Sequence, residues 1–384
     1  MFVSLSFYKM KFITPLLVIL LLFSCKRDQL VVTPPNSNPV PKIVYDSKIL
    51  LYPNATNPYS KNYIISANSQ FLVLNASSRW FGNDYVDVTH CWYNELLNEN
   101  CSFTENQYIY GQTTAACENN GNVFCFDRGY QTSAIKRIQG CNFGGEVYVK
   151  DDKGSVFTDE INFLKLTQKG NLIVEFNKDS LYCMDILGSI KWRISSSGVK
   201  LSNLHDVCET ASGDFLILGG SHTSASADDF CVTRLNKNGD VVWQKLYGGD
   251  LNDLPEQILY YNDQQIFLIG SSNSFGTNAN NREYIIHVNA DGAMFQQKTF
   301  GESLHSGMQC GKVYKDKLLI SGYCNSDMNS KGQVFVKLLD QDLNILQHAE
   351  SPTTSEHFTT SCALVNNSFA VCGNGFVMRF LLQY

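Results

Sequence analysis

The amino-acid sequence predicts an all-β fold, a β-propeller of about seven four-stranded blades, with six blades as the alternative. Three observations predict it: a motif that recurs about every 50 residues, apolar runs of strand length in phase with the motif, and glycine-containing turns between them. A repeated four-stranded unit of roughly this length is typical of propeller blades, which bury both sheet faces only against neighbouring blades. Residues 42–384 are long enough for about seven such units.

The recurring motif is clearest in two copies. Residues 234–249 read RLNKNGDVVWQKLYGG, and residues 287–302 read HVNADGAMFQQKTFGE. Gly239 and Gly292 lie 53 residues apart, and the Gln-Lys-x-aromatic-Gly that follows each of them keeps the same offset. An earlier copy and a weaker later copy are MDILGSIKWRI (184–194) and LLDQDLNILQHAES (338–351).

Each unit also contains an apolar run bounded by turn residues, as expected of a buried strand. These runs are GNLIVEF (170–176), GDFLILGGSHT (213–223), QIFLIGSSNS (265–274), DKLLISGYCNS (316–326) and NSFAVCGNG (367–375). A lead-in strand and a further alternating run complete a unit of four strands. Asn238-Gly239 and Asp291-Gly292 are typical of the tight turns between paired strands.

The two ends of the folded part predict how the ring closes. After Ser361 the chain is long enough for three strands but not for four. We expect the fourth from residues 42–52, KIVYDSKILLY, because a strand from the other terminus would remove an exposed sheet edge. Residues 60–160 contain strand-like runs whose repeat phase the sequence does not define.

The N-terminal segment predicts export. Residues 12–23 form an apolar run that is too short for a membrane-spanning helix and suits a signal peptide. The run ends in Leu-Phe-Ser before Cys25, which resembles a bacterial lipoprotein box and implies a signal peptide over 1–24 and lipidation of Cys25. The alternative is an ordinary signal peptide with an incidental cysteine. Residues 25–41, rich in Pro, Asn and Ser, predict a flexible tether.

The repeat resembles propeller repeats of secreted and surface proteins of Gram-negative bacteria, and it is similar to quinoprotein-type repeats. In those repeats a Trp after the turn glycine docks each blade on its neighbour. Trp192 and Trp243 match that Trp, whereas Gln296 and Gln347 replace it. The quinone-dependent enzymes need an acidic base and a calcium site, for which no motif is present, so no cofactor is expected. The resemblance implies a non-catalytic binding or scaffold lipoprotein of the cell envelope, at the outer membrane or cell surface.

Charge and motif content argue against several function classes. The net charge is −6 with no block of like charge, so no nucleic-acid partner is expected. No nucleophile elbow, phosphate-binding loop, dinucleotide fingerprint or zinc-protease motif occurs. Asp340-x-Asp342-x-Asn344 imitates a calcium loop but lacks its glycine and closing glutamate, so we interpret it as turn chemistry. The alternative function is a propeller glycoside hydrolase or polysaccharide lyase.

Two groups of residues are candidate sites for a protein or glycan partner. His205, His305 and His357 each precede a lead-in strand, a position expected near one mouth of the central channel, where imidazoles can hold a metal or an anion. Local hydrogen bonding is the alternative role. The segment RWFGNDYVDVTHCWYNE (79–95) combines aromatics with carboxylates, as glycan-binding grooves do, unless its aromatics form a blade core. Its candidate residues are Trp80, Asp84, Tyr85, Asp87 and Trp92.

The cysteines other than Cys25 number twelve, and an exported protein permits disulfides. Cys91 and Cys101 bracket a short loop and are the candidate pair, with Cys117 and Cys125 next. We expect the remaining group to be buried thiols at equivalent lead-in positions: Cys208, Cys310 and Cys362.

Overall fold

The structure is a computed structural model, and it describes residues 40–50, 62–67, 69–77, 85–97, 99–108, 115–117, 122–128, 133–139, 142–148, 161–177, 179–199, 201–222, 227–275, 280–301, 305–325, 332–352, 359–373 and 376–384. Within these ranges 28 strands form seven antiparallel four-stranded sheets, and the other regular element is the 3-10 helix η1 (Ser196–Gly198). The predicted propeller and its seven blades are confirmed. In the same ranges no helix is long and apolar enough to cross a membrane.

We number the blades along the chain. Blade 1 is β2 (Asn62–Ala67), β3 (Gln70–Ser77), β4 (Tyr85–Tyr93) and β5 (Glu99–Tyr108). Blade 2 is β6 (Ala115–Cys117), β7 (Asn122–Arg128), β8 (Ser133–Gln139) and β9 (Asn142–Tyr148). Blade 3 is β10 (Ile161–Leu166), β11 (Leu172–Phe176), β12 (Ser180–Met184) and β13 (Ile190–Ser195). Blade 4 is β14 (Asn203–Glu209), β15 (Phe215–His222), β16 (Asp228–Leu235) and β17 (Val241–Tyr247).

Blade 5 is β18 (Asp253–Asn262), β19 (Gln265–Ser272), β20 (Arg282–Val288) and β21 (Met294–Phe300). Blade 6 is β22 (His305–Tyr314), β23 (Lys317–Asn325), β24 (Gly332–Leu339) and β25 (Ile345–Glu350). Blade 7 is β26 (Thr359–Val365), β27 (Ser368–Gly373), β28 (Phe376–Gln383) and β1 (Lys42–Leu50). The segment that the sequence could not phase therefore contains blades 1 and 2.

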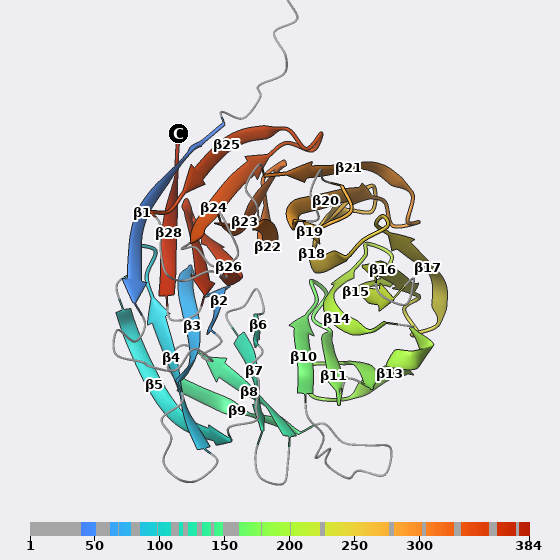
Figure 1. Ribbon diagram of the computed structural model, residues 1–384. Coiled ribbons are helices and arrows are strands. Elements are labelled where there is room, and N and C mark those ends of the chain that lie inside the picture. The colour runs from blue at the N-terminus through green and yellow to red at the C-terminus, as the bar shows by residue number, and fades with distance from the viewer. Residues whose placement is uncertain are drawn as a thin grey trace, which may run out of the picture. The chain divides into compact units, whose positions relative to one another are not determined.

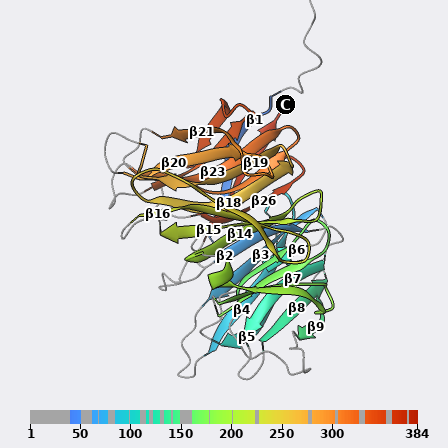
Figure 2. The same ribbon diagram turned by 90° about the vertical axis from the view of Figure 1, so that its right-hand side faces the viewer.

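The first strand of each blade, β26 for blade 7, lies innermost in the unit Pro41–Tyr384, as Figure 1 shows. Contacts join these inner strands in the order β10, β6, β2, β26, β22, β18 and β14. An ion pair between Lys165 on β10 and Asp206 on β14 completes the circle. In Figure 2 the labelled strands of blade 4 lie below those of blade 5.

Burial follows the position of a strand within its blade. The apolar runs predicted from the sequence are the second strands, and β19 and β27 are buried almost throughout. The outer strands β17, β21 and β25 are exposed or half-buried at almost every position. The core therefore lies between neighbouring sheets, so each blade depends on the next for its stability.

The turn glycines and docking tryptophans act as predicted. Gly239 and Gly292 have positive φ angles of 90° and 70°, which a glycine adopts without steric cost. A Cβ on Gly239 would lie 2.9 Å from Cγ of Trp192 on the preceding blade, and one on Gly292 would lie 2.9 Å from Cη2 of Trp243. Where Gln296 replaces the tryptophan, its amide donates to the Asp342 carbonyl of the next blade at 3.2 Å.

The calcium-like sequence over 340–344 forms a turn, as expected. The Asp340 carboxylate accepts hydrogen bonds from the Asn344 main chain at 2.7 Å and from its side-chain amide at 3.0 Å. The carboxylate is thus used within the hairpin.

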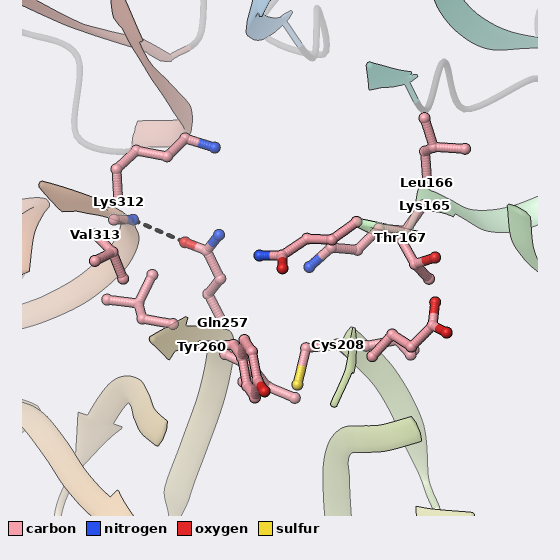
Figure 3. Close-up of a pocket in the computed structure, with 14 residues that line it drawn as sticks. Lys165, Leu166, Thr167, Cys208, Gln257, Tyr260, Lys312 and Val313 are labelled. Atoms are coloured by element: carbon pink, nitrogen blue, oxygen red, sulfur yellow. Dashed lines mark hydrogen bonds between the residues drawn. The ribbon is translucent and has the colours of Figure 1, made fainter. Parts of the chain in front are cut away.

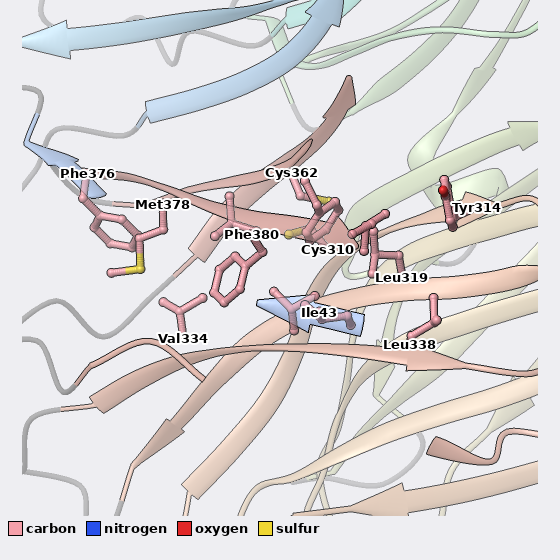
Figure 4. Close-up of a cluster of buried hydrophobic side chains, with 14 residues drawn as sticks. Ile43, Cys310, Tyr314, Leu319, Val334, Leu338, Cys362, Phe376, Met378 and Phe380 are labelled. Carbon is pink, nitrogen blue, oxygen red and sulfur yellow. The ribbon is translucent and has the colours of Figure 1, made fainter. Parts of the chain in front are cut away.

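Ring closure by the N-terminal strand is also confirmed. β1 pairs antiparallel with β28 from Lys42 opposite Gln383 to Leu50 opposite Phe376. Arg379 on β28 contacts Asp46 on β1 at 2.7 Å. Figure 4 shows the cluster of buried side chains beneath this pairing, in which residues of blade 7 pack against residues of blade 6.

Candidate functional site

Five of the seven inner strands share one irregularity. The pairing of β10, β14, β18, β22 and β26 with the next strand shifts register near the start or middle of the inner strand, which marks a β-bulge, and β18 has a second shift between Tyr260 and Asn262. The bulged residues are Asn162, His205, Glu256, Gln309 and Thr360. A bulge breaks the hydrogen-bond ladder locally and leaves main-chain groups that need other partners.

The residue directly after the bulge, which we call the clasp position, supplies such a partner to the following blade in blades 4, 5 and 7. Its occupants are Phe163, Asp206, Gln257, Cys310 and Ser361 on blades 3 to 7. Asp206 accepts the Ile258 amide at 2.9 Å, Gln257 accepts the Gly311 amide at 2.7 Å, and Ser361 accepts the Ile64 amide at 2.7 Å. Carboxylate, amide and hydroxyl oxygens thus perform the same structural task.

A cavity of about 280 Å³ opens beside these clasps, toward the ends of the inner strands of blades 3 to 6 (Figure 3). Its volume lies just below the usual range for small-molecule sites, about 300–1,000 Å³, so it suits one small chemical group. The lining residues are Lys165, Leu166, Thr167, Gln168, Val207, Cys208, Glu209, Gln257, Ile258, Leu259, Tyr260, Gly311, Lys312 and Val313.

Some charged side chains of this pocket have partners of opposite charge, and one has no such partner among the described residues. Lys165 on blade 3 pairs with the buried clasp residue Asp206 of blade 4. Glu209 accepts a hydrogen bond from Asn171 at 3.0 Å and lies 3.9 Å from the Lys169 ammonium. Lys312, which Figure 3 shows pointing into the pocket, makes no ion pair or hydrogen bond with any described residue.

The remaining polar groups favour binding over nucleophilic chemistry. Burial raises the pKa of the Cys208 thiol to about 12, so the thiolate needed for attack is scarce at neutral pH. Burial and the Asp263 hydrogen bond raise the pKa of Tyr260 to about 12. The Gln257 side-chain nitrogen makes no hydrogen bond to a described residue and can donate to a ligand.

The predicted histidines lie elsewhere on these strands. His205 is the bulged residue of β14, and burial lowers the pKa of its imidazole. His305 is the first residue of β22, four residues before the bulged Gln309, so the two histidines do not share a register as the sequence suggested. His357 lies outside the described residues. Among those described, no three His, Cys, Asp or Glu side chains gather as metal ligands.

The bulge residue of blade 5 is a second titratable group on this ring. Glu256 occupies the register position of His205, and burial raises the pKa of its carboxyl to about 7. His205 and Glu256 come before the residues of their strands that line the pocket. They therefore lie at a different level of the ring from Lys312.

The aromatic candidates cannot be placed as a site. Trp80 and Asp84 lie outside the described residues, while Tyr85, Asp87 and Trp92 belong to β4, the third strand of blade 1, where only the backbone is described. That strand is separated from the inner strand β2 by β3.

The cysteine predictions have mixed outcomes. Cys91 pairs with Ser102 and Cys101 pairs with Trp92, so the candidate disulfide partners are one residue out of register, and their bridge stays a prediction. The buried thiols Cys208, Cys310 and Cys362 are free, as expected. They occupy different rather than equivalent positions after the bulge.

Sequence reasoning missed both pocket lysines. Lys165 and Lys312 stand at the same register, two residues after the clasp position of their own blades. An alignment of the inner strands on their bulges would have revealed the match. The bulged residues themselves have no common side chain that could guide such an alignment.

No protein-family model matches the chain, and no curated protein matches its sequence. Several solved structures are similar to it. An extracellular domain described as part of a hybrid two-component system from B. thetaiotaomicron has a TM-score of 0.54 at 12% identity, over 88% of this chain and 43% of its own. The chain thus spans less than half the length of that structure.

Two further propellers show the same likeness. The Dos1 propeller has a TM-score of 0.51 at 10% identity, over 84% of this chain and 77% of its own. YCF48, solved with a D1 peptide, has a TM-score of 0.52 at 9% identity, over 90% of this chain and 100% of its own. At these identities the similarity shows the fold, and the chain is a β-propeller protein.

Proposed function

We propose that this protein is an exported lipoprotein of the cell envelope whose propeller is a non-catalytic binding module for a protein or glycan partner. In this proposal, residues 1–24 are removed as a signal peptide, lipid on Cys25 anchors the chain at the outer membrane or cell surface, and residues 25–41 tether the propeller. The observation that carries the binding role is the pocket built by the inner strands of four blades, with hydrogen-bond donors that have no partner among the described residues.

The composition of the pocket favours binding over the alternative of glycoside cleavage. Hydrolysis by the usual route needs two carboxyl groups across the scissile bond. Glu209 is the one carboxylate among the lining residues, and Asn171 and Lys169 already contact it. A peptide complex is known for YCF48, a protein of the same fold, which makes a protein partner a reasonable expectation here.

The binding role is tested by photo-crosslinking of the full-length chain in the producing bacterium. A photoreactive amino acid at Gln168, which lines the pocket, is expected to give an adduct of defined mass. The matched control carries it at Leu187, in the outer turn of the same blade and 79% exposed, and is expected to give none. Equal labelling at both positions, or no adduct at either, would contradict the proposal.

The predicted histidine face is tested with the same adduct. Changing His205, His305 and His357 together to Gln keeps polarity and removes titration. Loss of the adduct in a folded triple variant would move the docking site to the predicted histidine face. An adduct that survives there but is lost on changing Trp80, Tyr85 and Trp92 would move it to blade 1.

A further inference from the structure

Lys312 is distinguished from other lysines of the propeller by what its ammonium lacks. Lys317 and Lys337 pair with carboxylates, and Lys245 donates to the main-chain carbonyl of Asp291 at 2.8 Å. Lys312 is half-buried and has no such contact with any described residue. An ammonium that is partly removed from water gains from an anion beside it.

The repeat explains why this ammonium has no internal counter-charge. Lys165 of blade 3 pairs with Asp206, the clasp residue of the following blade. Lys312 holds the same register on blade 6, and the clasp residue of the following blade 7 is Ser361. A neutral hydroxyl thus stands where the corresponding contact of Lys165 has a carboxylate. The backbone needs only an acceptor at this position, which Ser361 provides to the Ile64 amide.

The charge left in the pocket matches one negative charge on a ligand. Lys165 is balanced by Asp206, and Glu209 is faced by Lys169, so Lys312 is the one lining cation without a counter-charge among the described residues. The amide nitrogen of Gln257, a neighbour of Lys312 in Figure 3, adds a donor for the second oxygen of a planar anion.

We propose that the Lys312 pocket binds a carboxylate of an acidic peptide segment of the partner, an inference that rests on the proposed binding function. The lining favours a peptide over an acidic sugar. Its single aromatic is Tyr260, whose hydroxyl is held by Asp263 at 2.7 Å and by the Ala211 amide at 2.9 Å. The half-buried aliphatic residues of the lining, which can contact the methylenes of a glutamate, are Leu166 and Val313.

The experiment titrates the mature protein with small probes by ligand-observed NMR. The acidic probe is N-acetyl-glutamate α-amide, and the neutral control is N-acetyl-glutamine α-amide. We expect a dissociation constant on the order of 1 mM for the acidic probe. The variant Lys312→Gln should weaken it by at least about tenfold, since a charged hydrogen bond is lost. Lys237→Gln, at an exposed turn of blade 4, should leave it unchanged.

A second variant tests the register argument without touching the lysine. Ser361→Asp places at blade 7 the carboxylate that Asp206 presents at blade 4, and it keeps an acceptor for the Ile64 amide. It should pair with Lys312 and also weaken binding of the acidic probe by about tenfold. Circular dichroism and thermal melting establish that each variant is folded before its binding is compared.

Several outcomes would overturn the assignment to a peptide carboxylate. These are equal binding of the neutral probe, unchanged binding by Lys312→Gln, or no binding of the acidic probe. Tighter binding of galacturonate would assign the pocket to an acidic glycan, and tighter binding of inorganic phosphate would assign it to a phosphorylated ligand. A photo-adduct at Gln168 without probe binding would leave the proposed function standing and reject only the carboxylate.

Discussion

The substitution Gly239→Ala tests the contact that joins blade 4 to blade 3. Gly239 has a φ of 90°, and a Cβ there would lie 2.9 Å from Cγ of Trp192 and 3.0 Å from its Cδ2. The indole is 6% exposed and packs edge-on against Phe215 with ring centroids 5.1 Å apart, so it has little room to withdraw. The added methyl therefore causes both backbone strain and overpacking.

The expected loss of stability is the sum of the costs of backbone strain and of overpacking. A left-handed backbone costs an alanine about 1–2 kcal/mol, and an extra methyl in a packed interior costs about 1–3 kcal/mol. We expect Gly239→Ala to lower the free energy of unfolding by about 2–5 kcal/mol. The matched control is Gly170→Ala, because Gly170 has a φ of 80° and a methyl group added there would have no atom within 4 Å. The control should cost only the backbone term.

The assay is equilibrium unfolding in denaturant, followed by tryptophan fluorescence and by circular dichroism. In a Trp192→Leu background the additional cost of Gly239→Ala over Gly170→Ala should disappear, because the methyl then has space. Equal losses for the two glycine variants in the wild-type background, within about 0.5 kcal/mol, would refute the docking argument. If Gly239→Ala still costs more stability than Gly170→Ala in the Trp192→Leu background, the extra cost arises from the turn alone.

Three further predictions concern closure, anchoring and charge. Deleting residues 42–52 removes the strand paired with β28 and should cause aggregation or a large loss of stability, and a truncated protein with an unchanged melting temperature would contradict ring closure. Cys25→Ser should release the protein from the membrane fraction, and unchanged detergent partitioning would contradict lipidation. Because burial raises the pKa of Glu256 from 4.5 to about 7, folding binds a proton in that window and stability falls as pH rises through it. Glu256→Gln should therefore exceed the wild type by up to about 3 kcal/mol at pH 8 and match it near pH 4, as measured by denaturant unfolding at each pH.

The parts of the fold that could be predicted are those with a residue-specific steric demand. The positive φ angles of Gly239 and Gly292 favour glycine, and a tryptophan fills the space above each of them. The turn glycine recurs in blades 3 to 5 and leaves a period in the sequence. Blades 1 and 2 lack that pattern, so their strands could be recognised while their phase could not. The closing strand was predictable because the last repeat was one strand short.

The candidate site was not predictable for a different physical reason. A β-bulge requires no particular side chain, and here Asn162, His205, Glu256 and Gln309 all occupy it. One extra residue shifts all later side chains to the other face of the strand. Without the bulge positions, His205 and His305 looked equivalent, and the match of Lys165 with Lys312 was not recognised. The structure places the two histidines at different registers and the two lysines at the same one.

The residue at the clasp position can change the charge in the pocket while the contact between neighbouring blades is kept. The following blade needs only an oxygen that accepts one amide, and Asp206, Gln257 and Ser361 all provide it at 2.7–2.9 Å. Charge at this position can therefore change from blade to blade with the amide still satisfied. Asp206 neutralises one inner lysine, and Ser361 leaves the register-equivalent Lys312 without a partner among the described residues. In a ring of repeats, such a neutral clasp is a simple way to create a binding charge at one blade while the same backbone contact still closes the interface.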